Sequence, residues 1–327
     1  MTIVKKLLKW TGIGLATLTV GLTAAVLVLE YRTHDVALPD IHASSDPAVI
    51  ARGRYLAYGA AHCVDCHGDP ARRAEAEAGQ EIPLSGGYEF KLPIGTIRPA
   101  NITSDRETGI GALSDGQIAR ALRYGVSRHG RTLAPFMPFA DLSDDDLGAI
   151  ISFLRAQPPV HNPVTSHALN PLGHAVAAFV LKPRGPSGPV PRSMPPAPTA
   201  EYGRYLVHSV GNCVGCHTKI DMRTGAFTAP LLSGGAAHES HSKPGTRFVT
   251  PNLTNDARTG RLFNWTEDLF VARFHMGKGA EGSPMPWRAF SRMNDQDLQA
   301  IYRYLKTVPG VENDTGDSVR TSTVASK

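Results

Sequence analysis

The chain has 327 residues, 42% of them hydrophobic, and carries 34 Lys and Arg against 29 Asp and Glu, for a formal net charge of +5. Part of that excess belongs to a basic N-terminal flank. Elsewhere no basic run is interleaved with aromatic residues, so the composition gives nucleic-acid binding no support.

The first 34 residues contain a candidate membrane anchor. Three lysines within the first nine residues precede an uncharged stretch from residue 10 to residue 29. Twenty residues at ~1.5 Å each cover the ~30 Å hydrocarbon core of a bilayer. The basic flank predicts a cytoplasmic N-terminus and export of the remaining chain. An uncleaved anchor is the favoured interpretation, and a signal peptide cut after Ala25 is the alternative.

All four cysteines lie in two copies of one pentapeptide, at residues 63–67 and 213–217. Both copies read C-x-x-C-H, the attachment signature of c-type haem. In this signature both thiols form thioether bonds to the haem vinyl groups, and the histidine binds the iron. The six expected haem-binding residues are Cys63, Cys66, His67, Cys213, Cys216 and His217.

A zinc site or a thioredoxin-like redox pair is the competing interpretation of C-x-x-C. Zinc sites of this type usually separate their halves by roughly fifteen to twenty residues. Here 150 positions separate Cys63 from Cys213, and each motif has its own histidine. The sequence therefore predicts two covalently bound haem c groups.

The sequence around the motifs is also duplicated, at an offset of 148 to 151 residues. A period this long indicates a duplicated domain and not a solenoid repeat. The matching segments are 53–56 and 203–206, 101–105 and 252–256, 137–138 and 285–286, and 146–154 and 297–305.

Each copy predicts a small, mainly α-helical domain. A short helix is expected before each motif, over residues 55–61 and 205–210, and two longer helices follow in each copy. Their expected N-terminal caps are Ser114 and Ser143 in the first copy and Thr266 and Asn294 in the second. The expected organisation is an anchor at 1–34, a first domain at 48–157, a Pro-rich linker at 158–199, a second domain at 200–309 and a disordered tail at 310–327.

Methionine is the expected second axial ligand in both copies. Met137 and Met285 are each followed by proline and an aromatic residue, and each precedes the last helix of its copy. A proline-locked loop can hold a thioether toward the iron at low entropic cost, and this ligand raises the reduction potential. The predicted metal ligands are therefore His67, Met137, His217 and Met285. The competing ligands are His129 in the first copy and His275, Met276 and Met293 in the second.

Residues 101–111, 125–131 and 135–138 resemble the cytochrome subunits of membrane-bound alcohol, aldehyde and gluconate dehydrogenases. The resemblance covers roughly residues 50–157 and 200–308. It implies two tandem cytochrome c-like domains behind a transmembrane helix, with the haems on the periplasmic side of a bacterial inner membrane. It also implies that Asn101 and Asn252 border the haem edge. Those subunits commonly carry three haems, whereas this chain has motifs for two.

An apolar stretch at residues 172–181 lies inside the proline-rich linker and is too short to span a membrane. We expect a short helix there, either buried between the domains or in contact with a partner.

If histidine and methionine coordinate both haem irons, no coordination position is left for a substrate. The sequence thus predicts an electron-transfer protein and not an enzyme. It would carry electrons from a dehydrogenase or a quinol-oxidising complex to a terminal oxidase or soluble cytochrome. The alternatives are a fixed subunit of a dehydrogenase complex and a dihaem enzyme. A peroxidase would lack one of the methionines, and a thiosulfate dehydrogenase would need a further cysteine ligand.

Overall fold

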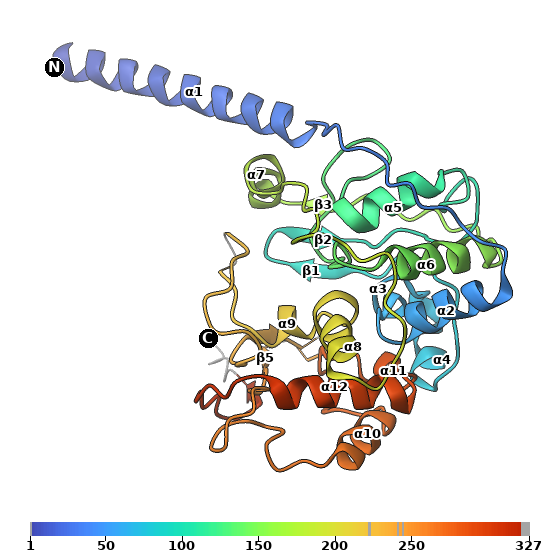
Figure 1. Ribbon diagram of the computed structural model, residues 1–327. Helices are drawn as coiled ribbons and strands as arrows, with labels where there is room; N and C mark the ends of the chain where they lie inside the picture. The colour runs from blue at the N-terminus through green and yellow to red at the C-terminus, as the bar shows by residue number, and fades with distance from the viewer. Residues whose placement is uncertain (1, 222–223, 241, 244, 322–327) are drawn as a thin grey trace.

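The computed structural model describes residues 2–221, 224–240, 242–243 and 245–321. It is mainly helical, and a long N-terminal helix projects from a folded body (Figure 1). The helices are α1 (Thr2–Glu30), α2 (Pro47–Tyr58), α3 (Cys63–His67), η1 (Pro70–Arg72), α4 (Arg73–Glu77), α5 (Asp115–Tyr124), α6 (Asp144–Ala156), α7 (Pro171–Phe179), α8 (Ala200–Tyr205), η2 (Leu206–Val210), α9 (Cys213–Cys216), α10 (Glu267–His275), α11 (Trp287–Phe290) and α12 (Asp295–Thr307).

The four predicted helix caps are confirmed. The side chains of Ser114, Ser143, Thr266 and Asn294 each accept a hydrogen bond from a backbone N–H in the first turn of the helix that follows. The helix before the first motif is longer than predicted, because it begins at Pro47 with Asp46 as its cap.

We call residues 47–169 the first unit and residues 199–321 the second unit. In each, the helix before the motif packs against the last long helix, α2 on α6 and α8 on α12. Gly53 and Gly203 lie at the two crossings, where a side-chain Cβ would collide with the backbone carbonyls of Ala149 and Ala300. The same close approach in both units explains why this glycine occurs in both sequence copies.

Each unit also contains a small antiparallel sheet that the sequence did not predict. The first sheet consists of β1 (Phe90–Leu92), β2 (Gly95–Ile97) and β3 (Ala168–Leu169), in that order. The second consists of β4 (Ala237–Glu239), β5 (Thr246–Val249) and β6 (Val319–Thr321). These strands have two to four residues, too few to produce a recognisable alternating pattern.

The described part of the C-terminal tail differs from the predicted disorder. Val311 and Asn313 bond to Thr254 and Thr259, and β6 pairs with β5. In the first unit, the backbone N–H groups of Val160 and Asn162 likewise donate to the hydroxyls of Thr103 and Thr108. The chain after each last helix is thus held by threonine hydroxyls of its own unit, of which those of Thr103 and Thr254 are buried. The polar composition of this segment does not reveal these contacts. Residues 322–327 lie outside the described residues.

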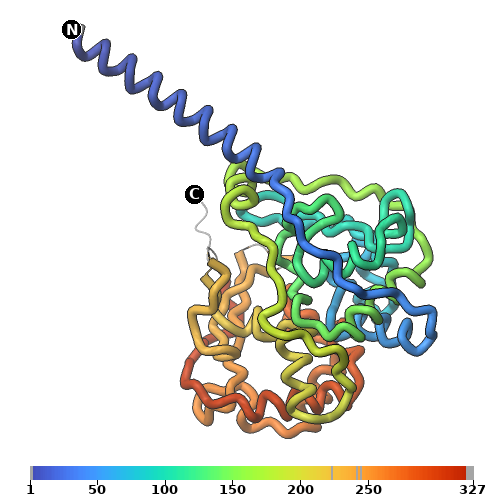
Figure 2. Tube along the Cα trace, turned by 45° about the horizontal axis from the view of Figure 1, so that its top comes forward, coloured from blue at the N-terminus to red at the C-terminus, as the bar shows by residue number. Residues whose placement is uncertain are grey.

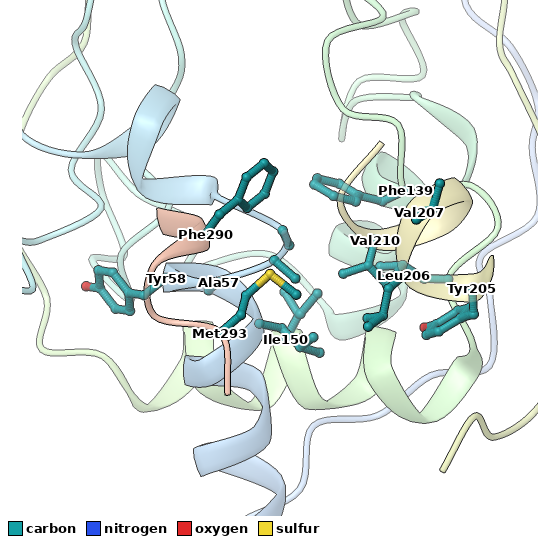
Figure 3. Packing of buried hydrophobic residues seen from close by; sticks show 14 of the residues in the cluster. Ala57, Tyr58, Phe139, Ile150, Tyr205, Leu206, Val207, Val210, Phe290 and Met293 are labelled. Carbon is teal, nitrogen blue, oxygen red and sulfur yellow. The ribbon is translucent and has the colours of Figure 1, made fainter. Parts of the chain in front are cut away.

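The two units share one apolar cluster. Phe290 and Met293 of the second unit lie close to Ala57 and Tyr58 of the first, and Phe139 of the first unit faces η2 of the second (Figure 3). The ring of His62, just before the first motif, also contacts Phe290, with 5.5 Å between the ring centroids. Both motifs therefore adjoin one continuous apolar cluster.

A polar network with approximate two-fold symmetry closes the edge of this interface. The Tyr55 hydroxyl donates to Asp297 at 2.8 Å and accepts from the backbone N–H of Asn294. Tyr205 of the second unit makes the same two bonds to the first unit. Its hydroxyl donates to Asp146 at 2.8 Å and accepts from the backbone N–H of Ser143. Each unit thus covers the N-terminus of the other unit's last helix.

Candidate haem sites

Both motifs begin after a residue in the left-handed conformation. His62 has φ of 40° and Asn212 has φ of 50°, a conformation that few side chains adopt without cost. It turns the chain sharply into α3 and α9. The two cysteines and the histidine of the first motif lie within α3, whereas in the second motif the cysteines lie within α9 and His217 is its C-cap.

Each motif histidine is oriented by a backbone carbonyl. His67 Nδ1 donates to the carbonyl of Ala100 at 2.7 Å, and His217 Nδ1 donates to that of Pro251 at 3.1 Å. A histidine whose Nδ1 is held in this way presents its Nε2 as the free ligand atom. Both imidazoles are thus fixed in the tautomer that a haem iron needs.

Burial sets the protonation of the motif side chains. It lowers the pKa of His217 to about 4, against the opposing effect of the hydrogen bond that His217 donates to the Pro251 carbonyl, and it lowers the pKa of His67 as well. Burial, with a smaller contribution from the second cysteine of each motif, raises the pKa of Cys63 and of Cys213 to about 12. The imidazoles are therefore neutral, as metal ligands must be, and these thiols lack the low pKa of a reactive redox pair.

An asparagine-centred network holds the carbonyl behind each histidine. Asn101, next to Ala100, donates to Thr108 and to the Val160 carbonyl, and accepts from the backbone and hydroxyl of Thr103. Every one of these bonds recurs at Asn252, with the equivalent partners Thr259, Val311 and Thr254. Both asparagines form the Asx-turn that their sequence allows, and both are buried.

A glycine loop completes the support of each motif. The backbone N–H groups of Gly86 and Gly234 donate to the carbonyls of His67 and His217, each at 2.8 Å. Both glycines have positive φ, 73° and 75°. A sequence search for side-chain ligands misses these contacts and the Ala100 and Pro251 carbonyls, because the groups involved belong to the backbone.

The two predicted methionines border the apolar cluster that also adjoins Cys63 and Cys213. The four competing ligands differ in exposure and bonding. His129 is exposed, His275 bonds to Asp295 at 2.7 Å, and Met276 is 63% exposed. Met293 is buried beside the first unit (Figure 3).

One buried cationic atom fits an anionic cofactor in the second unit. The Arg273 guanidinium stacks on Trp287, 3.8 Å from the ring centroid, just after the Met285–Pro286 loop. Its Nη1 is buried and has no hydrogen-bond partner among the described residues. A carboxylate such as a haem propionate would satisfy this group. The donor set, the tautomers and this cation are all consistent with haem c.

A fold of short helices around C-x-x-C-H motifs, with each histidine held by a carbonyl, defines a c-type cytochrome. Residues 200–309 match the cytochrome c family, and the chain belongs to that family. The predicted family resemblance is thereby confirmed.

Curated relatives extend the similarity to most of the chain. The cytochrome c subunit of a quinone-dependent alcohol dehydrogenase from Gluconobacter oxydans is 36% identical over 286 residues, which cover 82% of this chain and 56% of that protein. The gluconate 2-dehydrogenase cytochrome c subunit of Pantoea cypripedii is 33% identical over 290 residues, 83% of this chain and 62% of the relative. A dihaem cytochrome c-type protein of Cereibacter sphaeroides is 29% identical over 284 residues, 82% of this chain and 91% of the relative. This chain spans 56% to 64% of the length of the first four relatives.

Proposed function

We propose that the chain is a membrane-anchored dihaem cytochrome c that carries single electrons. The first unit is then a second cytochrome c domain, with haem c at Cys63, Cys66 and His67 as well as at Cys213, Cys216 and His217. The observation that supports this most directly is the recurrence in both units of the histidine–carbonyl bond and of the complete asparagine network. Shared geometry at matching positions indicates shared ligation.

The bound haem iron would supply reversible one-electron chemistry. The protein's own residues orient the imidazoles, exclude water through the shared apolar cluster and provide Met137 and Met285 as second axial ligands. A soft, neutral thioether favours the reduced iron. With both methionines in place, no coordination position is left for peroxide, which argues against the peroxidase alternative.

The partner is proposed from the relatives. Two of them are named as cytochrome subunits of an alcohol and a gluconate dehydrogenase. We infer a dehydrogenase as the electron donor, to which the chain is bound either transiently or as a fixed subunit. A terminal oxidase or a soluble cytochrome is the expected acceptor.

Helix α1 supports a location at the bacterial inner membrane, with the haem units in the periplasm. Residues Ile3–Glu30 are long and apolar enough to cross a bilayer, and none of this span is buried inside the protein. Trp10 begins the uncharged stretch at residues 10–29 and Tyr31 follows shortly after it, and both side chains are exposed. Aromatic residues favour the membrane–water boundary at such positions. The alternative is a signal sequence that is removed.

Intact mass tests the haem content. The holoprotein should carry the mass of two haems, and Cys63→Ala and Cys213→Ala should each disrupt one attachment. Rapid, stoichiometric binding of carbon monoxide to one reduced haem, with peroxide turnover, would overturn the carrier interpretation.

Near-infrared spectroscopy tests the methionine ligands. The ferric protein should show the sulfur-to-iron band at an intensity for two sites. Met137→Ala or Met285→Ala should each remove about half of the band and lower one midpoint potential by roughly 100 mV or more. Met276→Ala is the matched control, because that side chain is exposed. A half-intensity band in the unmodified protein would point to His129.

A further inference from the structure

Helix α7 has an unusual distribution of side chains. In a helix on the surface of a soluble protein, the outward side is polar. In α7 the inward side carries Gly173 and Ala178, which are buried. The outward side carries Leu172 and Phe179, which are 57% and 47% exposed, and Val180, the C-cap, is 45% exposed. Residues 172, 176, 179 and 180 fall on one side of a helix by the 3.6-residue period.

Helix α7 packs on the end of α1 and not between the two units. On its inward side, Gly173 lies against the backbone carbonyl of Ile94 in the first unit. Four residues of α1 are partly covered, Ala25, Val26, Leu29 and Glu30, and residues 3–24 are exposed. Their spacing places them on one side of the last turn and a half of the helix. His174 of α7 also contacts the Glu30 carboxylate at 2.8 Å.

These contacts fix the height of α7 along α1. Residues 25–30 occupy the last ~9 Å of the helix. Tyr31 follows directly, and its ring is stacked beneath Arg131 at 5.3 Å. If α1 crosses the bilayer, this is the level of the outer boundary between hydrocarbon and headgroups. The outward side of α7 then has lipid next to it, and not bulk water.

The orientation of α7 agrees with this location. In Figure 1, α7 is seen nearly end-on while α1 runs across the picture, and in Figure 2 the same helix lies beside the base of α1. A helix that crosses a transmembrane helix at its end lies along the membrane surface. Lys182, exposed just after α7, would be at the level of the lipid phosphates.

We propose that α7 is an interfacial membrane helix, whose Leu172–Phe179–Val180 face inserts into the outer leaflet and fixes the haem units relative to the bilayer. This proposal rests on the proposed anchor α1. An interfacial helix of this kind gains its binding free energy from buried apolar area. The segment between α1 and the first unit is itself held, since His34 bonds to Gly130 and Ala43 to Asp115. A lipid contact at α7 would therefore fix the tilt of both units relative to the bilayer.

The test uses the full chain, loaded with haem and reconstituted into lipid nanodiscs of phosphatidylethanolamine and phosphatidylglycerol. Phe179→Cys introduces a thiol for a nitroxide label, and power saturation compares its accessibility to oxygen and to a water-soluble nickel chelate. Phe263→Cys is the matched control, because Phe263 is 38% exposed and lies on the second unit before α10. The oxygen-to-nickel ratio should be several-fold higher at position 179 than at position 263.

Each other outcome has a distinct meaning. The proposal is overturned if the protein is held in the nanodisc and the oxygen-to-nickel ratio at position 179 equals that of a label in water. The anchor would still stand, and the exposed face of α7 would be open to a protein partner. Dipolar broadening between labels would show that a second copy covers the face, which also overturns it. A protein that does not enter nanodiscs overturns both the anchor and this inference. Labelling of the protein without added cysteine would show unattached haem motifs, a failure of the proposed function alone.

A double variant provides an independent measurement. Leu172→Asp with Phe179→Asp should abolish the fixed tilt of the haems in the linear dichroism of oriented membranes, and Phe263→Asp should leave it unchanged. An unchanged tilt in the double variant would overturn the proposal, provided that both haems are still present by mass.

Discussion

The two units support their motif histidines in the same way but differ where they meet. The asparagine networks match bond for bond, whereas the interface network is symmetric only in its tyrosines. Arg52 of the first unit pairs with Asp146 at 2.8 Å and donates to Tyr202 at 2.9 Å. Tyr202 is itself the residue equivalent to Arg52, so the second unit has no arginine for Asp297. The two units thus share the support of their sites and differ at their interface.

The two aspartates consequently have different environments. Asp297 is fully buried, and its Oδ1 has no hydrogen-bond partner among the described residues. Burial, together with the charge of Asp146, raises its pKa against the opposing effects of Tyr55 and Arg52. Asp146 is held by Arg52 at both carboxylate oxygens. Matched substitutions in the two units test this difference.

The largest difference is expected between Asp146→Asn and Asp297→Asn. The first leaves the largely buried Arg52 without its carboxylate and should lower the free energy of unfolding by about 3 kcal/mol. The second removes a poorly partnered carboxylate and should change it by less than about 1 kcal/mol at pH 7. Urea unfolding of the haem-loaded protein measures both. Equal losses would show that Asp297 is as well compensated as Asp146.

Asn101→Ala and Asn252→Ala should cost the same, about 2 kcal/mol each, because each removes an equivalent buried set of hydrogen bonds. The same unfolding measurement applies. A difference of more than about 1 kcal/mol would contradict the equivalence of the two networks. Asn313→Ala is a useful comparison. Among the described residues its side chain donates to the Ser233 carbonyl alone, so this substitution should cost less.

The interface tyrosines should differ by a smaller amount. Tyr55→Phe removes the hydroxyl that donates to Asp297 and should cost about 1.5 kcal/mol. Tyr205→Phe should cost about 0.5 kcal/mol, because Arg52 continues to hold Asp146. If Tyr205→Phe proves the more costly of the two, the assigned role of Arg52 is wrong.

The smallest effect concerns pH. Because the pKa of Asp297 is raised above its unfolded value of 3.8, its favourable contribution is complete below pH 3.8 and is lost as pH rises through the folded pKa. The groups that act on it are Arg52, Tyr55, Asp146 and Tyr202. The stability of Asp297→Asn relative to the unmodified protein should therefore increase between pH 4.5 and pH 8. A constant difference across this range would mean that Asp297 stays unperturbed.

Much of this structure could be predicted from the sequence, for identifiable reasons. The capped helices have strong local signals, and the haem motifs are defined by side-chain spacing. The sheets were missed because strands of two to four residues carry too little pattern. The carbonyls behind His67 and His217 were missed because every residue has a backbone carbonyl, so the residue type at that position carries no signal. Asn101 and Asn252 were noticed, but their role in holding those carbonyls depends on contacts with residues 57 to 59 positions away.

The reciprocal covering of the two last helices has a consequence for how the chain can be divided. Tyr55 and Tyr205 each satisfy groups that belong to the other unit, and Phe290 and Met293 complete an apolar core on the far side of the boundary. A single proteolytic cut in the exposed linker at residues 187–196 should therefore leave two fragments that copurify with both haems. Either fragment expressed alone would present the core of the interface to water and lack the hydroxyl that completes its last helix. The units resemble separate domains in sequence, but we expect them to unfold together in one cooperative transition.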